Sequence, residues 1–208
     1  IGSIKGKRFA VLGGFGGIGS ALCRLLEEEG ALPIPLSRRT GLDLTQPLSI
    51  SKTFQELGVL SGLINCAGNL VVKSLDSLTT EEIERQVHIN FTGLVIACQK
   101  AEIEEGGHLI NIASSAYTRG RKNYSIYSAA KAAVINFTQA LAEEKPHLRI
   151  HAVIPQRTNT AMRTANFPQE DKASLLAPEE VAKTILNLLK DPLTTGSLAE
   201  VKKRACPV

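Results

Sequence analysis

Short apolar runs alternate with segments of helical periodicity along the chain, and this alternation constrains the fold more than any other feature. The apolar runs are typical of buried strands and lie at residues 9–12, 31–37, 61–68, 106–115, 147–155 and 194–201. The segments with helical spacing of apolar residues lie at 17–30, 49–58, 79–100, 125–145 and 174–190. Strands that alternate with helices pair in parallel, because each helix crosses over the sheet between two strands. The sequence therefore predicts an α/β fold, a doubly wound parallel sheet with helices on both faces.

The composition is that of an ordinary globular protein. The 208 residues are 43% hydrophobic and 21% charged, and no apolar run approaches the length of a membrane span. A net charge of +4 is too small to indicate a nucleic-acid partner. The four cysteines, Cys23, Cys66, Cys98 and Cys206, lack metal-ligand spacing, so we expect reduced thiols, no metal site and a cytoplasmic location. We expect one domain over residues 1–208, with no membrane or nucleic-acid partner.

A cluster of glycines, GGFGGIG, lies where the first strand ends and the next helix begins. In a doubly wound sheet, ligands bind at the carboxyl ends of the strands. Glycine allows a tight turn and a close approach of the backbone to a pyrophosphate, which a helix N-terminus stabilises. The alternative is a flexible loop without a ligand. We expect a nucleotide cofactor to bind at Gly13, Gly14, Phe15, Gly16, Gly17, Ile18 and Gly19, with its pyrophosphate at the helix N-terminus.

Four elements in chain order resemble the short-chain dehydrogenase/reductase family. The glycine spacing GxxxGxG is similar to that of the family, although Leu12 stands where the family usually has Thr. A second element looks like the family's NNAG turn, with Cys for the second Asn: Asn65, Cys66, Ala67 and Gly68. The other elements match the catalytic tetrad of the family: Asn90, Ser114, Tyr127 and Lys131. The resemblance implies a Rossmann-type fold, a nicotinamide cofactor and the interconversion of a carbonyl and an alcohol.

The end of the second strand bears on the choice of cofactor. Ser37, Arg38 and Arg39 stand where an enzyme that selects NAD more often has an acidic residue. Positive charge there suits a 2′-phosphate, so we expect NADP(H) to be preferred over NAD(H); the alternative is a solvated arginine pair. Asp43 and Leu44 follow after a few residues, whereas members of the family commonly insert a helix between these points. The resemblance implies that the helix after the second strand is shortened or missing, and that Asp43 caps the adenine.

Tyr127 and Lys131 lie four residues apart, so a helix brings both side chains to one face. Hydride transfer to a carbonyl develops negative charge on oxygen, which a positioned acid must protonate. We expect Lys131 to lower the pKa of Tyr127, because an ammonium favours the phenolate, and Ser114 to hydrogen-bond to the substrate oxygen. The resemblance further implies that Lys131 binds the nicotinamide ribose and that Asn90 holds a water in a proton relay. Tyr124 has no lysine four residues on and is the weaker candidate acid.

The loop after the strand at 147–155 departs from the family, because Pro155 is followed by Gln156 rather than by Gly. Gln does not follow a glycine turn freely, so we expect this loop to differ in shape. Pro155, Thr158 and Thr160 remain candidates to contact the cofactor, as do Tyr127 and Lys131.

Cationic residues predict the chemistry of the substrate. Arg157 and Arg163 in this loop, and Arg121 on the opposite side with Arg119 and Lys122 near it, indicate an anionic substrate, because guanidinium forks suit phosphate or carboxylate. The alternative is a set of ordinary surface charges. The run at 155–163 resembles that of short reductases that are fused to sugar-phosphate cytidylyltransferases and reduce a ketopentose phosphate.

We therefore expect a small ketose phosphate, such as ribulose 5-phosphate, as the substrate. A generic carbonyl or 3-oxoacyl reductase is the next interpretation. A catalytically silent NADP-binding sensor or scaffold is a hypothesis of another class, since a fold does not fix a function. Members of the family often pack through the helices that carry Asn90 and Tyr127, so the resemblance implies a homodimer or homotetramer.

Overall fold

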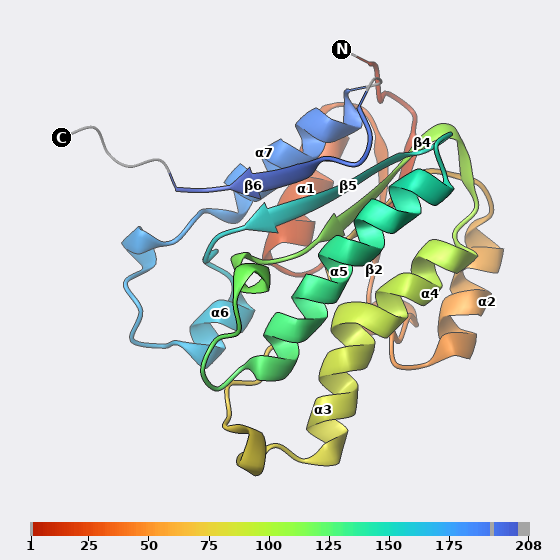
Figure 1. The fold of residues 1–208 in the computed structure, drawn as a ribbon. Helices are drawn as coiled ribbons and strands as arrows, with labels where there is room; N and C mark the ends of the chain where they lie inside the picture. The colour runs from red at the N-terminus through yellow and green to blue at the C-terminus, as the bar shows by residue number, and fades with distance from the viewer. Residues whose placement is uncertain (1, 192–193, 204–208) are drawn as a thin grey trace.

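A computed structural model describes residues 2–191 and 194–203, in which six strands form one parallel sheet (Figure 1). The strands lie in the order β2-β1-β3-β4-β5-β6, and every neighbouring pair is parallel. Their bounds are β1 Arg8–Leu12, β2 Leu32–Leu36, β3 Leu60–Asn65, β4 Ile103–Ile112, β5 Arg149–Pro155 and β6 Leu198–Val201. The predicted doubly wound α/β fold is confirmed. Cys206 lies outside the described residues.

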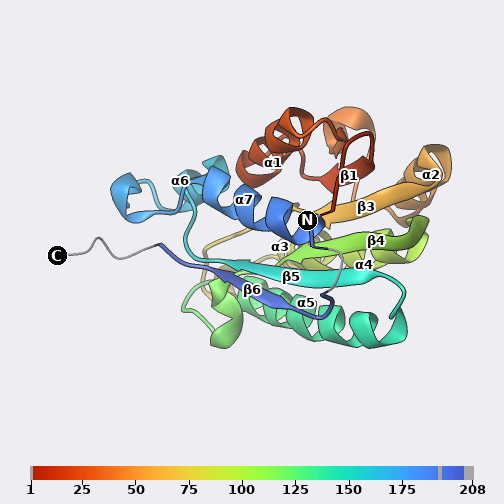
Figure 2. The same cartoon turned by 90° about the horizontal axis from the view of Figure 1, so that it is seen from above.

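Helices cover both faces of the sheet, as the view from above shows (Figure 2). They are α1 Gly17–Glu28, α2 Pro47–Leu57, α3 Thr80–Val87, α4 Gly93–Lys100, α5 Ser125–Glu144, α6 Ala161–Asn166 and α7 Pro178–Leu189. On the face covered by α1 and α7, one buried cluster contains Phe9, Leu22 and Ile185. On the face covered by α2, α4 and α5, a second cluster contains Phe54 and Leu63. In residues 2–191 and 194–203, none of the helices has the length and apolar character needed to cross a membrane.

The strand β2 forms one edge of the sheet, which explains its two prolines. Leu32 donates its N–H to Lys7 on the side of β1, so Pro33 and Pro35, which have no N–H, alternate with it and face the open edge. After β2 the chain makes only the short 3-10 turn Arg38–Thr40 before α2 begins. The helix that the family commonly has directly after the second strand is therefore missing, as the sequence predicts.

The predicted continuous helix at 79–100 is wrong in its middle. A π-helical turn, His88–Thr92, separates α3 from α4, and the N–H of Gly93 bonds to the carbonyl of His88. At this point the helix lies very close to the chain that precedes α2. A Cβ on Gly93 would lie 2.5 Å from the carbonyl oxygen of Leu44. A π turn inserts one residue into a helix and often marks a functional position. Here it contains Asn90, whose side chain is fully buried.

The order of the strands determines where a ligand can bind. From β1 the chain crosses to β2 on one side, and it then returns past β1 to form β3 on the other side. The carboxyl ends of β1 and β3 are therefore a topological switch point, where doubly wound sheets bind their ligands. The glycine loop after Leu12 and the turn after Asn65 both lie there.

Candidate active site

A cavity of about 870 Å³ opens at the carboxyl ends of the strands. Most of the predicted site residues line it: Gly13, Gly16, Gly17, Ile18, Gly19, Ser37, Arg38, Asp43, Leu44, Cys66, Ala67, Gly68, Ser114, Arg121, Tyr127, Lys131, Pro155, Arg157, Thr158, Thr160 and Arg163. The others lie outside its lining: Gly14, Phe15, Arg39, Asn65 and Asn90. A smaller hollow of about 440 Å³ has Phe15, Ser37, Arg38 and Arg39 in its walls.

The glycine loop is shaped by close contacts of the backbone. Gly13 has a φ of +70°, and a Cβ there would lie 2.8 Å from the backbone nitrogen of Ala67. A Cβ on Gly19 would overlap the carbonyl oxygen of Gly13. Gly14 does not line the cavity but packs against β2. A Cβ on Gly14 would lie 2.6 Å from the Cα of Pro35. Close packing therefore leaves no room for a side chain at Gly13, Gly14 or Gly19.

The N-terminus of α1 has the properties of a phosphate site. Its N-cap residue, Gly16, has no side chain that could accept a hydrogen bond from the first turn. The backbone N–H groups of this turn therefore remain available to an anion, and the helix dipole favours negative charge at this end. The residues present fit the pyrophosphate of a dinucleotide.

Cations gather where the predicted adenosine half would lie. The guanidinium group of Arg39 lies over the ring of Phe15, with 5.6 Å from Cζ to the ring centroid.

The carboxylate of Asp43 accepts hydrogen bonds from the N–H and the hydroxyl of Thr45, and these bonds hold its pKa below the usual value, with Arg38 and Arg85 adding to the effect. Asp43 thus lines the cavity as an ionised carboxylate with partners of its own.

Asn65 supports the sheet rather than the cavity. Its amide nitrogen donates to the side-chain oxygen of Asn111, 2.6 Å away, and Asn111 in turn donates to the hydroxyl of Thr138. These buried side chains link β3, β4 and α5. The turn that follows, with Cys66 in its first position, reaches the cavity.

Asn90 holds the loop that follows this turn. Its side-chain oxygen accepts the N–H of Asn69, and its amide nitrogen donates to the carbonyls of Asn69 and Gln86. Because these protein groups occupy both ends of the amide, the structure gives Asn90 a role in fixing residues 68–70 over the cavity. The predicted water relay at Asn90 stays a prediction.

Ser114, Tyr127 and Lys131 converge in the cavity. Ser114 follows β4, its hydroxyl accepts the N–H of Ala116 at 3.2 Å, and the same hydroxyl acts to lower the pKa of the Tyr127 phenol. The ammonium of Lys131 donates to the carbonyl of Ile112 at 2.8 Å and lies 5.7 Å from the centroid of the Tyr127 ring. The helix α5 therefore presents Tyr127 and Lys131 on one face, as the spacing predicts.

The expected lowering of the Tyr127 pKa by Lys131 is wrong. Burial raises the pKa of Tyr127, and the two groups that oppose this rise are the Ser114 hydroxyl and the cation of Arg163. Burial also lowers the pKa of Lys131 to about 8. Both side chains are buried, so desolvation determines the direction of both pKa shifts.

Three of the five predicted cations line the substrate end of the cavity. They are Arg121, Arg157 and Arg163, whereas Arg119 and Lys122 lie outside the lining. Arg163 and Arg157 both bond to Glu170, which sequence reasoning did not single out. The loop bearing Gln156 forms without a left-handed residue, and the N–H of Gln156 bonds to Val201.

Several further lining residues were not predicted. Asn69 and Leu70 directly follow the NCAG turn. Ligands bind at the carboxyl ends of the strands, so counting two more residues after this turn as part of the strand end would have included both. Arg85 projects from α3 into the cavity, and no motif in the sequence marks it. Tyr124, which the sequence marks as the weaker candidate acid, also lines the cavity, at 6.3 Å from Tyr127 between ring centroids.

Comparison with known proteins agrees with this geometry. Residues 41–171 match the family described as short chain dehydrogenase. The chain is 36% identical over 207 residues to the bifunctional ribulose 5-phosphate reductase/CDP-ribitol pyrophosphorylase Bcs1 of Haemophilus influenzae, a match that covers 95% of this chain and 44% of that protein. The chain thus spans less than half the length of that relative. It is 31% identical over 227 residues to carbonyl reductase family member 4 of Xenopus laevis, covering 94% of this chain and 96% of that protein.

Solved structures share the fold. The aldohexose dehydrogenase of Thermoplasma acidophilum, in ligand-free form, superposes with a TM-score of 0.86 at 26% identity, over 99% of this chain and 98% of that one. A small-chain dehydrogenase in complex with NADPH gives a TM-score of 0.83 at 24% identity, over 94% of this chain and 96% of that one. With the glycine loop and the Ser-Tyr-Lys group in one cavity, these matches show that the chain belongs to the short-chain dehydrogenase/reductase family of oxidoreductases.

Proposed function

We propose that the protein is an NADPH-dependent reductase of a small anionic ketone, with a ketose phosphate such as ribulose 5-phosphate as the substrate. The observation that carries the proposal is that one cavity contains both the proton-transfer group, Ser114, Tyr127 and Lys131, and the three arginines Arg121, Arg157 and Arg163. A substrate whose carbonyl lies beside Tyr127 would thus have its negatively charged group within reach of these guanidinium groups.

The residues of the cavity provide a route for the proton. When bound, NADPH supplies the hydride that adds to the carbonyl carbon. Tyr127 then gives its phenolic proton to the carbonyl oxygen, while the hydroxyl of Ser114 holds that oxygen by a hydrogen bond. Burial keeps Tyr127 protonated, as an acid requires, and the pKa of about 8 lets Lys131 exchange a proton near neutral pH. We assign Lys131 to returning the proton to Tyr127 and to binding the nicotinamide ribose.

NADPH is the proposed cofactor because of the cations at the end of β2. Arg38 lies between the cavity and the smaller hollow, and Arg39 and Phe15 line that hollow. A 2′-phosphate there would meet two guanidinium groups and no neighbouring acid from β2. The solved relative of the same fold that contains NADPH is compatible with this assignment.

A second candidate is a carbonyl or 3-oxoacyl reductase. Two relatives favour it, carbonyl reductase family member 4 of Xenopus laevis at 31% identity and a 3-oxoacyl-[acyl-carrier-protein] reductase of Mus musculus at 28%. The arginines favour the first candidate, as does the 36% identity to a relative named for ribulose 5-phosphate reduction.

The test is NADPH oxidation with matched carbonyl compounds. We expect ribulose 5-phosphate to react with a kcat/KM at least about a hundredfold above that of ribulose, because charge-assisted hydrogen bonds to the phosphate contribute about 1.5–3 kcal/mol each. Acetoacetyl-coenzyme A serves as the acyl comparison. Equal rates for ribulose and its phosphate would refute the substrate, and no oxidation with any of these compounds would favour the silent NADP-binding protein.

A further inference from the structure

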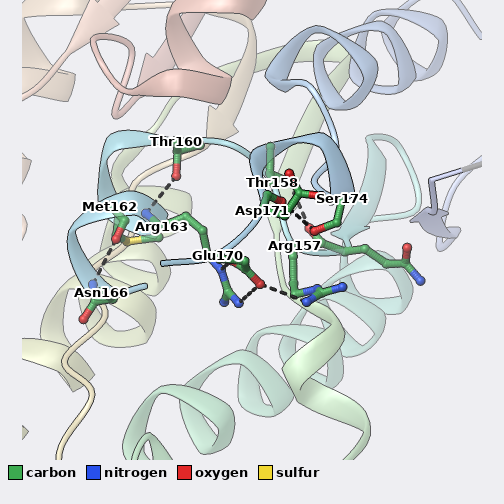
Figure 3. A network of polar contacts seen from close by, with 10 residues as sticks. Arg157, Thr158, Thr160, Met162, Arg163, Asn166, Glu170, Asp171 and Ser174 are labelled. Carbon is green, nitrogen blue, oxygen red and sulfur yellow. Dashed lines mark hydrogen bonds and ion pairs between the residues drawn. The ribbon is translucent and has the colours of Figure 1, made fainter. Parts of the chain in front are cut away.

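Three charged side chains of the segment after β5 form one contiguous cluster (Figure 3). Arg163 of α6 donates from Nε to Oε2 of Glu170 at 2.6 Å and from Nη2 to Oε1 at 2.8 Å. Arg157 donates from Nη1 to the same Oε1 at 2.8 Å. One carboxylate thus receives three N–H donors from two guanidinium groups, and these bonds hold the pKa of Glu170 below its usual value.

Arg163 is fixed by several independent contacts. Besides its two-pronged bond to Glu170, its guanidinium carbon lies 3.8 Å from the centroid of the Phe167 ring. Its side chain is only 16% exposed. Such a fork and stack leave an arginine little freedom, so Arg163 has its orientation before any ligand arrives.

Arg157 depends on Glu170 much more. Its side chain is 57% exposed, and the hydrogen bond to Glu170 is the contact that brings its guanidinium beside that of Arg163. Two guanidinium groups that bond to the same carboxylate oxygen lie close enough to repel each other, and the negative charge of that carboxylate offsets the repulsion. Without Glu170, we expect Arg157 to move out into solvent.

The cluster has a free side. Arg157 and Arg163 line the cavity, while Glu170 is not among the lining residues. Glu170 takes Nη1 of Arg157 and the Nε and Nη2 edge of Arg163, so N–H groups of both guanidinium groups are left for an anion, since each guanidinium carries five N–H bonds.

We propose that Glu170 is a specificity-determining residue that holds Arg157 beside Arg163 and so builds a two-arginine receptor for the phosphate of the substrate. The inference rests on the proposed reduction of a small anionic ketone. It assigns the preference for phosphate to a residue that itself carries a negative charge and does not contact the ligand.

The first experiment compares Glu170→Gln with Asp171→Asn. Both changes remove one negative charge from the same loop, but Asn at position 171 can still accept the N–H of Ala173, as Asp171 does now. We expect Glu170→Gln to raise the KM for ribulose 5-phosphate about tenfold and to leave the KM values for ribulose and NADPH unchanged. Asp171→Asn should change none of them. A lower KM for the phosphate in Glu170→Gln would show that the carboxylate competes with the ligand, and an equal rise for both sugars would show a merely structural role.

A double-mutant cycle tests whether Glu170 acts through Arg157. Arg157→Gln alone should raise the KM for ribulose 5-phosphate by a similar factor. Adding Glu170→Gln to it should give no further rise, because the side chain that Glu170 holds is already gone. Independent, multiplying effects of the two changes would overturn the proposed coupling.

Binding of inorganic phosphate separates this inference from the proposed function. Calorimetric titration is done on the enzyme saturated with NADP⁺, so that the cofactor occupies its own phosphate site. We expect phosphate to bind the wild type and to bind Glu170→Gln about tenfold more weakly. If ribulose 5-phosphate is reduced but phosphate binding does not depend on Glu170, the receptor is wrong and the function stands. If phosphate binding depends on Glu170 but ribulose and its phosphate react equally, the function is wrong and the receptor stands.

Discussion

The two ends of the cavity are built in different ways. At the nucleotide end, backbone atoms pack so closely that Gly13 and Gly19 leave no room for a Cβ. At the substrate end, side chains make the contacts: Arg163 with Glu170 and Phe167, and the amide of Asn166 with the carbonyl of Leu70 at 3.2 Å. A backbone cradle tolerates few substitutions, whereas side-chain pairs can be exchanged one at a time. We therefore expect substitutions at the first end to disturb the glycine loop itself and substitutions at the second end to change individual side-chain contacts.

The largest expected effect separates chemistry from cofactor binding. Tyr127→Phe removes the phenolic proton but keeps the ring that packs against Tyr124. Because general acid catalysis contributes about 10²–10⁴-fold, we expect kcat to fall about a thousandfold. The dissociation constant of NADPH, measured by fluorescence titration, should stay the same. Retained turnover would transfer the acid role to another group, and Tyr124→Phe is the matched control that should keep most of the activity.

The next effect concerns the nucleotide end. Gly19→Ala places a methyl group onto the carbonyl oxygen of Gly13, so the loop must move. We expect the free energy of unfolding to fall by about 3 kcal/mol and NADPH binding to weaken at least about tenfold. Denaturant titration and fluorescence titration measure the two losses. Gly120→Ala is the control, since a Cβ there meets nothing within 4 Å; if both variants bind NADPH alike, the cradle is not built by close packing.

This contrast also explains what the sequence could predict. The glycine loop and the Tyr127–Lys131 pair are local patterns, because a turn or one helical turn fixes their geometry, and the structure brings both to the cavity. Glu170 and Arg85 have no local pattern, since they reach their partners only through the path of a loop or a helix in three dimensions. The π turn at Asn90 was missed for the same reason, because a distant contact between Gly93 and Leu44 accompanies it. The raised pKa of Tyr127 comes from burial, which spacing along the chain does not reveal.

Asn90 lies outside the cavity lining and holds the backbone of Asn69, which lines the cavity. Asn90→Ala removes the partners of both backbone groups of Asn69. A buried polar group without a partner costs about 1–3 kcal/mol, so we expect the free energy of unfolding to fall by about 2 kcal/mol. The KM for NADPH should rise as well, because residues 68–70 line the cavity. The exposed Asn187 supplies the control, Asn187→Ala, and equal stability of the two variants would contradict the role assigned to Asn90.

The smallest expected effect sharpens the nucleotide end itself, by separating its backbone cradle from its two side-chain cations. The double variant Arg38→Ala/Arg39→Ala keeps the glycines of the loop but removes the positive charge beside the smaller hollow, together with the stack of Arg39 on Phe15. We expect the dissociation constant of NADPH to rise about tenfold, which is about 1.4 kcal/mol, and that of NADH to stay the same. The matched control, Arg119→Ala/Lys122→Ala, removes two cations that do not line the cavity. A parallel loss for both cofactors would mean that the arginines stabilise the loop and do not recognise the 2′-phosphate, because only a contact with that phosphate can weaken one cofactor and spare the other.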